Sequence, residues 1–300
     1  MIAFPASRAT VAAVVTVVAS LLVAGCKKGD AGREAADSAA ADSAAPASAS
    51  AADPAGVVTV TATDFAFDAP AEVPAGLTTF RLVNRGPSLH HIQLIRLDSG
   101  KTVADFEAAL KKGGPPPRWA VMAGGPNPPE VGQTASATVP LEPGTYVMLC
   151  FIPAADGVPH VMKGMSKPIT VTGPAPAGGA EPTADAVVTL KDYDFTLSKP
   201  LAAGKQTIRV DNAGPQPHEV AVIRLKPGKT PEDFERWGEK PVGEAPGTLH
   251  GGVSGIMPGT HAFMELDLPA GDYALICFVP DGKDGKPHFV HGMSKRIKVG

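Results

Sequence analysis

The sequence predicts an all-β protein made of two tandem antiparallel β-sandwiches, each with one short inserted helix. The first observation is composition, because 33 glycines and 31 prolines in 300 residues indicate many turns between short strands. The second is periodicity, since short alternating or continuous apolar segments recur between those turns. The third is an internal repeat whose two copies stay in step along their length. A period this long indicates a duplicated domain and not a solenoid.

Length and charge set the outer limits of the interpretation. A chain of 300 residues with 44% hydrophobic content is long enough for two ordinary domains. A formal net charge of -3 gives no indication of a nucleic-acid partner. The composition is therefore that of an ordinary globular protein without a polyanionic ligand.

The N-terminus, residues 1–26, is predicted to be a targeting segment. Arg8 precedes an apolar run at 11–23, which is short for a membrane span and typical of a signal peptide. The run ends in Leu-Val-Ala-Gly-Cys26, which resembles a bacterial lipoprotein signal, in which the cysteine becomes the lipidated first residue. The alternative is an ordinary signal peptide or signal anchor with an incidental cysteine. The expected location is the bacterial cell envelope, lipid-anchored on the periplasmic or outer-membrane face.

The rest of the chain divides by composition. Residues 27–56 are rich in Ala, Ser and Asp and are expected to form a disordered tether, because they offer little apolar surface to bury. The first repeat is expected at 57–172 and the second at 186–300, with a Pro- and Gly-rich linker at 173–185 between them.

Five segments of the first repeat are predicted strands: 57–61, 79–83, 92–97, 135–141 and 146–151. Each alternates apolar and polar residues or runs apolar, which is typical of strands with one or both faces buried. Turn phrases such as Pro-Ala-Gly and Glu-Pro-Gly separate them. The pattern indicates a small sandwich.

One segment of each repeat has the signals of a helix. In the first repeat Thr102 is the expected N-cap, Asp105 completes a capping box, and Gly113 is the stop. In the second repeat Thr230 is followed by Pro231, the residue favoured in a first helical turn. The inserted helices are therefore expected at 102–113 and 230–238.

Cysteine usage points to a metal. If Cys26 is acylated, Cys150 and Cys277 remain, one in each repeat. Equivalent positions in two separate cores do not easily come within disulfide range. Two unpaired cysteines in an exported protein are well explained by metal ligation.

Each of these two cysteines belongs to a longer repeated phrase. An upstream His follows the pattern Asn-x-Gly-Pro-x-x-His, and the Cys is followed by Pro-His and then by Gly-Met-Ser-Lys. A thiolate, two imidazoles and a thioether are ligands that suit copper. The candidate metal ligands are His90, Cys150, His160 and Met165 in the first repeat, and His218, Cys277, His288 and Met293 in the second.

With these motifs, each repeat resembles a cupredoxin, the blue-copper family of plastocyanin and azurin, and its Cys-to-Met loop is similar to that of copper nitrite reductases. The resemblance covers both repeats. It implies two cupredoxin-like Greek-key β-sandwiches, the two ligand sets given above, up to two copper ions and a function in electron transfer. Because His91 lies beside His90, and His291 lies near His288, either neighbour remains an alternative ligand.

The sequence also suggests what the protein does not do. Neither strand cysteine has an adjacent histidine and the chain has no His-x-His pair, so no catalytic centre of the oxidase or nitrite-reductase type is expected and the protein is predicted not to be an enzyme. Histidines 250 and 261 are expected on the exposed surface, the alternative being that they line a domain interface or an accessory site. Three hypotheses remain open: an electron carrier, a copper-binding or copper-delivery lipoprotein, and a metal-free interaction scaffold. The expected partners are the membrane, through the lipid, and an unidentified redox or copper-exchange protein, with no nucleic acid.

Overall fold

The computed structural model describes residues 56–113, 116–174, 180–239 and 243–300. The expected signal peptide with Cys26 and nearly all of the expected tether lie outside the described residues, as does part of the linker. Among the described residues, no helix is long and apolar enough to cross a membrane.

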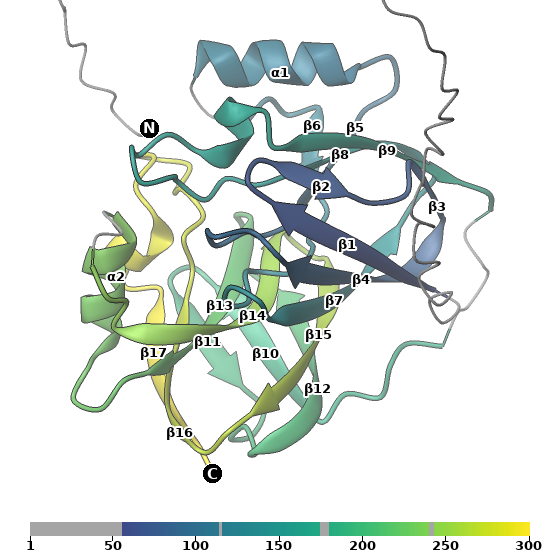
Figure 1. Ribbon diagram of the computed structural model, residues 1–300. Helices are drawn as coiled ribbons and strands as arrows, with labels where there is room; N and C mark the ends of the chain where they lie inside the picture. The colour runs from purple at the N-terminus through teal and green to yellow at the C-terminus, as the bar shows by residue number, and fades with distance from the viewer. Residues whose placement is uncertain (1–55, 114–115, 175–179, 240–242) are drawn as a thin grey trace, which may run out of the picture. The chain divides into compact units, whose positions relative to one another are not determined.

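The first repeat is built almost entirely of strands (Figure 1). Its elements are β1 (Val57–Thr63), β2 (Ala66–Asp68), β3 (Glu72–Pro74), β4 (Gly76–Asn84), β5 (Gln93–Leu97), α1 (Val103–Lys112), β6 (Ala120–Met122), β7 (Thr134–Leu141), β8 (Gly144–Leu149), the 3-10 helix η1 (His160–Lys163) and β9 (Ser166–Thr172). All five predicted strands and the helix are found, whereas the short β2, β3 and β6 and the later β9 lacked a distinctive pattern.

The second repeat follows the same plan with a longer strand after its helix. Its elements are β10 (Ala186–Lys191), β11 (Asp194–Leu197), β12 (Gly204–Asn212), β13 (His218–Leu225), α2 (Pro231–Glu239), β14 (Gly247–Ile256), β15 (His261–Leu268), β16 (Gly271–Ile276), the 3-10 helix η2 (His288–His291) and β17 (Ser294–Val299). The prediction of an all-β chain with one short helix in each repeat is confirmed.

Three sheets organise these strands. An eight-stranded sheet has the order β11-β10-β12-β15-β7-β4-β1-β2, a five-stranded sheet has the order β3-β9-β8-β5-β6, and a four-stranded sheet has the order β14-β13-β16-β17. The largest sheet joins the repeats, because β15 pairs antiparallel with β7, with Phe263 opposite Thr138 and Glu265 opposite Ser136. The two repeats therefore share a continuous sheet.

The sheets are mixed, which corrects the expectation of purely antiparallel sandwiches. Strands β1 and β4 run parallel, as do β10 and β12, and β3 runs parallel to β9. Parallel neighbours need a crossover connection. In the first repeat this crossover runs through β3. After β1 and β2 the chain forms β3, which pairs with β9 in the five-stranded sheet, and then returns to the eight-stranded sheet as β4.

Alternating burial explains how the sheets enclose the core. Along β1, residues Val58, Val60 and Ala62 are buried while their neighbours are more exposed, which is the two-residue period of a strand with one face on a core. The principal apolar cluster combines the eight-stranded sheet, through Phe80, with the five-stranded sheet, through Met148, and it extends into the second repeat. Packing between sheets thus places the ends of β8 and β16 inside the molecule.

The two helices each cover one of the smaller sheets (Figure 1). Helix α1 begins with the expected capping box, in which Thr102 Oγ1 accepts from Asp105 N at 3.1 Å, and it ends at Gly113. Its Phe106 packs on the five-stranded sheet, and Phe234 of α2 packs on the four-stranded sheet. Contacts group all the described residues into one compact unit, so the division into domains at 57–172 and 186–300 stays a prediction.

Candidate metal centres

The first candidate centre forms where β8 ends. Cys150 directly follows β8, His160 begins η1, and Met165 directly precedes β9. Backbone hydrogen bonds fold this loop back on itself, because Met165 N donates to the His160 carbonyl at 3.0 Å and Cys150 N donates to the Met165 carbonyl at 3.3 Å. The fourth residue, His90, comes from the segment just before β5. All four residues are fully buried.

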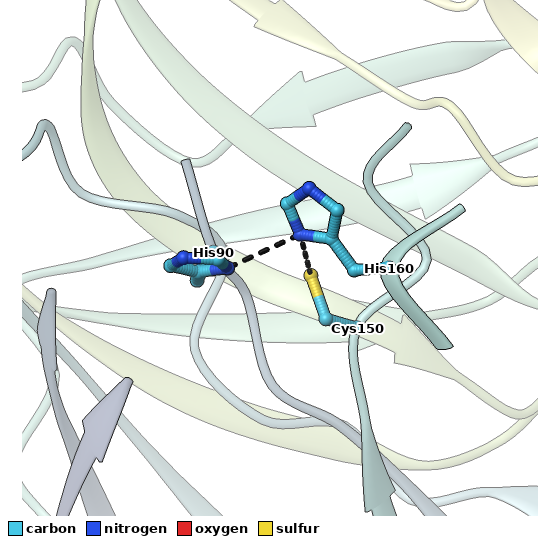
Figure 2. Close-up of side chains that lie close together, drawn as sticks. All are labelled: His90, Cys150 and His160. Atoms are coloured by element: carbon cyan, nitrogen blue, oxygen red, sulfur yellow. Dashed lines mark hydrogen bonds between the residues drawn. The ribbon is translucent and has the colours of Figure 1, made fainter. Parts of the chain in front are cut away.

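Three side chains of this group point toward one another (Figure 2). His160 Nδ1 lies 3.1 Å from His90 Nδ1 and 3.6 Å from Cys150 Sγ. Their ligand atoms all lie within 4.8 Å of one another. The structure therefore brings together three of the predicted ligands and places the backbone of Met165 beside them.

The second candidate centre repeats this geometry. His288 Nδ1 lies 3.0 Å from His218 Nδ1 and 3.4 Å from Cys277 Sγ, and Cys277 Sγ lies 4.0 Å from His218 Nδ1. Met293 is buried, and its backbone N–H and carbonyl bond to His288 and Cys277 as in the first repeat. Both cysteines are free thiols.

A carboxylate orients one imidazole of each centre. Asp64 Oδ1 lies 2.7 Å from His90 Nε2, and Asp192 Oδ1 lies 2.6 Å from His218 Nε2. A neutral imidazole that donates from Nε2 carries no proton on Nδ1, so its lone pair is directed at the other two ligand atoms. Carboxylates in this position fix the tautomer of metal-binding histidines.

Neither aspartate was predicted from the sequence as part of the site. They open the repeated phrases Asp64-Phe-Ala-Phe and Asp192-Tyr-Asp-Phe, which served only to align the repeats. The signal that could have revealed them is an acidic residue kept at the same place in both copies of a repeat that also keeps four ligand types.

The structure explains the repeated Asn-x-Gly phrase before the first histidine. Asn84 Oδ1 accepts from Gly86 N at 3.1 Å, and Asn84 Nδ2 donates to the Ser88 carbonyl at 2.9 Å. A Cβ atom on Gly86 would lie 2.6 Å from His90 Nε2. Glycine is therefore required so that the loop can pass close to the His90–Asp64 pair. Gly214 meets the same constraint at His218.

Burial sets the protonation of the side chains in the metal-free protein. It lowers the pKa of His160 and of His288 to about 4, with the second imidazole of each pair adding to the effect. It raises the pKa of the Cys150 thiol to about 12 and that of Cys277 well above its usual range. At neutral pH the imidazoles are neutral and have a free lone pair, while the thiols are protonated and must release a proton to bind a metal.

The residues present fit a copper ion. Ligands about 2.0–2.3 Å from a common ion in a trigonal plane are about 3.5–4 Å apart, a separation close to those found between the sulfur and nitrogen atoms here. Two His and one Cys with a weak axial Met form the ligand set of blue-copper sites. In addition, the buried Nε2 atoms of His160 and His288 have no hydrogen-bond partner among the described residues, so both rings are held through Nδ1, the atom that lies near the cysteine sulfur.

His91 and His291, the alternative ligands, lie outside these groups. His91 Nε2 accepts the backbone N–H of Phe151 at 2.9 Å. At the equivalent place in the second repeat, Glu219 Oε1 accepts the N–H of Phe278 at 3.0 Å. His291 is partly exposed and lies 3.2 Å from Asp284 Oδ1. The geometry thus favours His90 and His288 as the residues that face the cysteines.

The surroundings of the two centres differ in charge. Asp281 Oδ2 lies 3.7 Å from His288 Nε2 and is bonded to Tyr193 Oη at 2.5 Å and to Gln216 Nε2 at 2.9 Å. In the first repeat Phe65 stands in place of Tyr193, Ser88 in place of Gln216, and Ala154 in place of Asp281. The second centre therefore has a buried carboxylate that the first lacks.

The two remaining histidines are half-buried rather than exposed. His250 lies in β14, where it forms an isolated bridge with Pro129 of the first repeat and stacks edge-on against Tyr273. His261 of β15 pairs with Glu181 at 2.9 Å. His250 thus lies at the contact between the repeats, which is the alternative that the sequence left open for it.

No family model and no curated protein matches this chain. Among solved structures, the chain is similar to an auracyanin from Roseiflexus castenholzii, with 23% identity over 40% of this chain and 100% of the other and a TM-score of 0.30. It is also similar to auracyanin A, a "blue" copper protein from Chloroflexus aurantiacus, with 21% identity over 39% and 100% of the chains and a TM-score of 0.28. A copper nitrite reductase from Nitrosomonas europaea matches with 17% identity over 81% and 92% of the chains and a TM-score of 0.24.

The prediction that the protein is not an enzyme is wrong in light of these matches. Copper nitrite reductases and oxidases are among the similar structures, and each covers 81% of this chain. The prediction depended on the absence of a histidine beside each cysteine and of a His-x-His pair. Active sites are assembled from residues that the fold brings together, so the absence of a local motif does not exclude one.

Proposed function

We propose that this chain is a copper-binding protein that transfers electrons through one or two mononuclear blue-copper-type sites. The observation that carries the proposal is the convergence, at two places, of one Cys Sγ and two His Nδ1 atoms in a buried group. In each group a carboxylate holds one imidazole with its Nδ1 lone pair facing the others. In the metal-free protein His160 Nδ1 can donate a hydrogen bond to His90 Nδ1, and once that proton is released the same ring nitrogens can bind a cation.

The chemistry of the ligands favours copper over other ions. Thiolate and imidazole also suit zinc, but a buried methionine at the same end of the strand adds a soft thioether, which suits copper. A copper ion held there supplies one-electron exchange. The protein contributes fixed ligands and exclusion of water, because His90, Cys150 and His160 are fully buried, as are their counterparts.

Exposed apolar side chains beside the centres support exchange with a protein partner. Val158 and Met162 flank His160 in the sequence and are 38% and 46% exposed, and Val290 lies two residues after His288 and is 47% exposed. Exposed apolar side chains in the loop next to each buried centre would offer contact points for a protein partner. The partner in this proposal is a redox or copper-exchange protein that docks on these loops.

The proposal includes export and lipid anchoring at Cys26, which rest on the N-terminal sequence alone. Expressed in a Gram-negative host, the full chain is expected to partition into a detergent phase and to carry an acylated N-terminal cysteine by mass spectrometry. The variant Cys26→Ala is expected to lose both properties. Recovery of the unchanged chain with its first 25 residues attached would support the signal-anchor alternative.

A copper titration tests the function. Adding Cu(II) to the metal-free protein is expected to produce an intense thiolate-to-copper charge-transfer band in the visible spectrum. Each of the variants Cys150→Ser and Cys277→Ser is expected to lose the absorbance of one centre and to bind one copper ion fewer per chain. The double variant is expected to lose the whole band. Serine keeps the size of the side chain but is a poor ligand for copper.

Other outcomes of the titration identify the alternatives. Stoichiometric uptake of Cu(I) without a visible band on Cu(II) addition would support copper binding or delivery without electron transfer. No stoichiometric uptake of either ion would contradict both copper functions and leave the interaction scaffold.

A further inference from the structure

A third cluster of metal-ligating side chains lies beside the second candidate centre, on the segment between Cys277 and Met293. One ligand atom from each of Asp281, Asp284 and His291 lies within 4.8 Å of the other two. Asp281 is buried, Asp284 is exposed and His291 is partly exposed, so the cluster can be reached from solvent. Two carboxylates and one imidazole are ligands that zinc accepts, with a fourth position left for water.

The backbone of this loop brings the three residues together. Asp281 N donates to the Lys286 carbonyl at 2.7 Å, and Gly285 N donates to the Asp281 carbonyl at 2.8 Å, which closes a tight turn. His291 Nε2 lies 3.2 Å from Asp284 Oδ1. In the metal-free protein this ring nitrogen can donate to the carboxylate, and a cation can take the place of that proton. Lys286 Nζ lies 4.0 Å from Asp284 Oδ2, an exposed pair that contributes little energy.

A buried imidazole nitrogen without a partner faces the cluster from the protein interior. His288 Nε2 is fully buried, has no hydrogen-bond partner among the described residues, and lies 3.7 Å from Asp281 Oδ2. Because His218 donates from Nε2 to Asp192, its Nδ1 accepts, and His288 donates to it from Nδ1. In the metal-free protein His288 Nε2 therefore carries no proton, and its lone pair faces a carboxylate oxygen. A cation bound at Asp281 relieves this contact between two acceptors.

The first repeat shows the same loop without the cluster. Asp156 is the counterpart of Asp284, since each accepts the backbone N–H of the residue two positions later. Lys163 stands in place of His291, and its Nζ lies 2.5 Å from Asp156 Oδ2. Asp281 has only an alanine as its counterpart. The second repeat thus lacks the lysine ammonium that balances the carboxylate in the first, and it has one more carboxylate to balance.

We propose that Asp281, Asp284 and His291 form a binding site for a divalent cation of the zinc type, separate from the cysteine-containing centre. The ion balances the two carboxylates as Lys163 balances one carboxylate in the first repeat. It binds next to the second centre, because Asp281 also contacts His288. A consequence that rests on the proposed copper function is that the bound ion offsets the charge of Asp281 and raises the reduction potential of that centre.

A zinc titration tests the site without copper. The full chain with Cys150→Ser and Cys277→Ser, which lacks both thiols, is titrated with Zn²⁺ and followed by calorimetry. We expect one ion to bind per chain. Adding His291→Lys or Asp284→Asn is expected to weaken binding by more than about 10-fold, since the loss of a partner that only orients a ligand costs about that much. The matched control Asp156→Asn makes the same change in the first repeat and is expected to leave binding unchanged.

The effect on the second centre is measured in Cys150→Ser loaded with one copper ion. Adding Zn²⁺ is expected to raise the reduction potential, in the same direction as removal of the Asp281 charge. With His291→Lys in the same chain, Zn²⁺ is expected to cause no shift. Circular dichroism establishes that each variant is folded.

The outcomes separate this inference from the proposed function. The absence of saturable zinc binding to the chain without thiols would overturn the site, as would equal binding in His291→Lys and Asp284→Asn, which would place the ion elsewhere. Neither result depends on copper, so a failed copper titration leaves the zinc site standing. Zinc binding that leaves the potential unchanged would refute the link between the two sites.

Discussion

Replacing Asp192 with Asn is expected to lower the affinity of the second centre for copper by about 10- to 100-fold, the usual effect of losing a partner that orients a metal-binding histidine. Asp192 Oδ1 lies 2.6 Å from His218 Nε2, and the histidine is fully buried. Asn has the same shape but no charge, and it no longer favours the tautomer with a free Nδ1. Asp64→Asn is expected to act in the same way on the first centre alone.

Competition with a chromophoric Cu(I) chelator measures this change. A matched control is Asp194→Asn, two residues away, where the carboxylate is exposed and pairs with Lys295 at 2.8 Å without contact to the centre. Asp194→Asn is expected to leave the affinity unchanged. Equal affinities in the Asp192 and Asp194 variants would show that the carboxylate does not orient the ligand.

The sequence predicts the metal ligands of this site but not the aspartates that orient them. The ligands could be found because their residue types and their order recur in both repeats, and the structure brings His90, Cys150 and His160 together as that order suggested. Asp64 lies 26 residues from His90 and bonds to it through side chains only. No spacing rule connects two such positions, so their contact required the fold.

For the fold, likewise, the sequence predicts where strands lie but not how strands from different repeats pair. Alternation of apolar residues identified β1, β4 and β7 because burial on one face depends on the strand itself. It did not identify the pairing of β7 with β15. The alternation of apolar side chains shows which face of a strand is buried. It does not show which strand pairs with its edge, because that pairing is made by backbone N–H and C=O groups, which are the same in every sequence. The continuous sheet across the repeats was therefore not predictable from either repeat.

Replacing Asp281 with Ala is expected to raise the reduction potential of the second centre. Asp281 is 3% exposed and lies 3.7 Å from His288 Nε2. Although burial alone would raise its pKa, hydrogen bonds from Tyr193 and Gln216 hold that pKa below its usual range, so the group is ionised at neutral pH. A fixed negative charge favours the more positive oxidation state of a nearby ion. The second centre should consequently have a lower potential than the first.

Coulomb's law gives the size of the effect. Two unit charges about 8 Å apart interact by roughly 2 kcal/mol at an effective dielectric constant of about 20. This corresponds to about 90 mV for one electron. We therefore expect Asp281→Ala to raise the potential by tens of millivolts, measured by spectroelectrochemical titration in the Cys150→Ser background, where only the second centre is loaded.

The first repeat offers the reciprocal variant, because Ala154 occupies the place of Asp281. Both residues follow a proline that bridges to the proline before the loop histidine, and Ala154 N donates to the Val158 carbonyl as Asp281 N donates to that of Lys286. Ala154→Asp is expected to lower the potential of the first centre in the Cys277→Ser background. If the potential of the second centre falls or stays constant in Asp281→Ala, the carboxylate does not set the difference between the centres. If both shifts occur as expected, the second centre is the stronger reductant of the two, because the charge of Asp281 disfavours the reduced ion beside it.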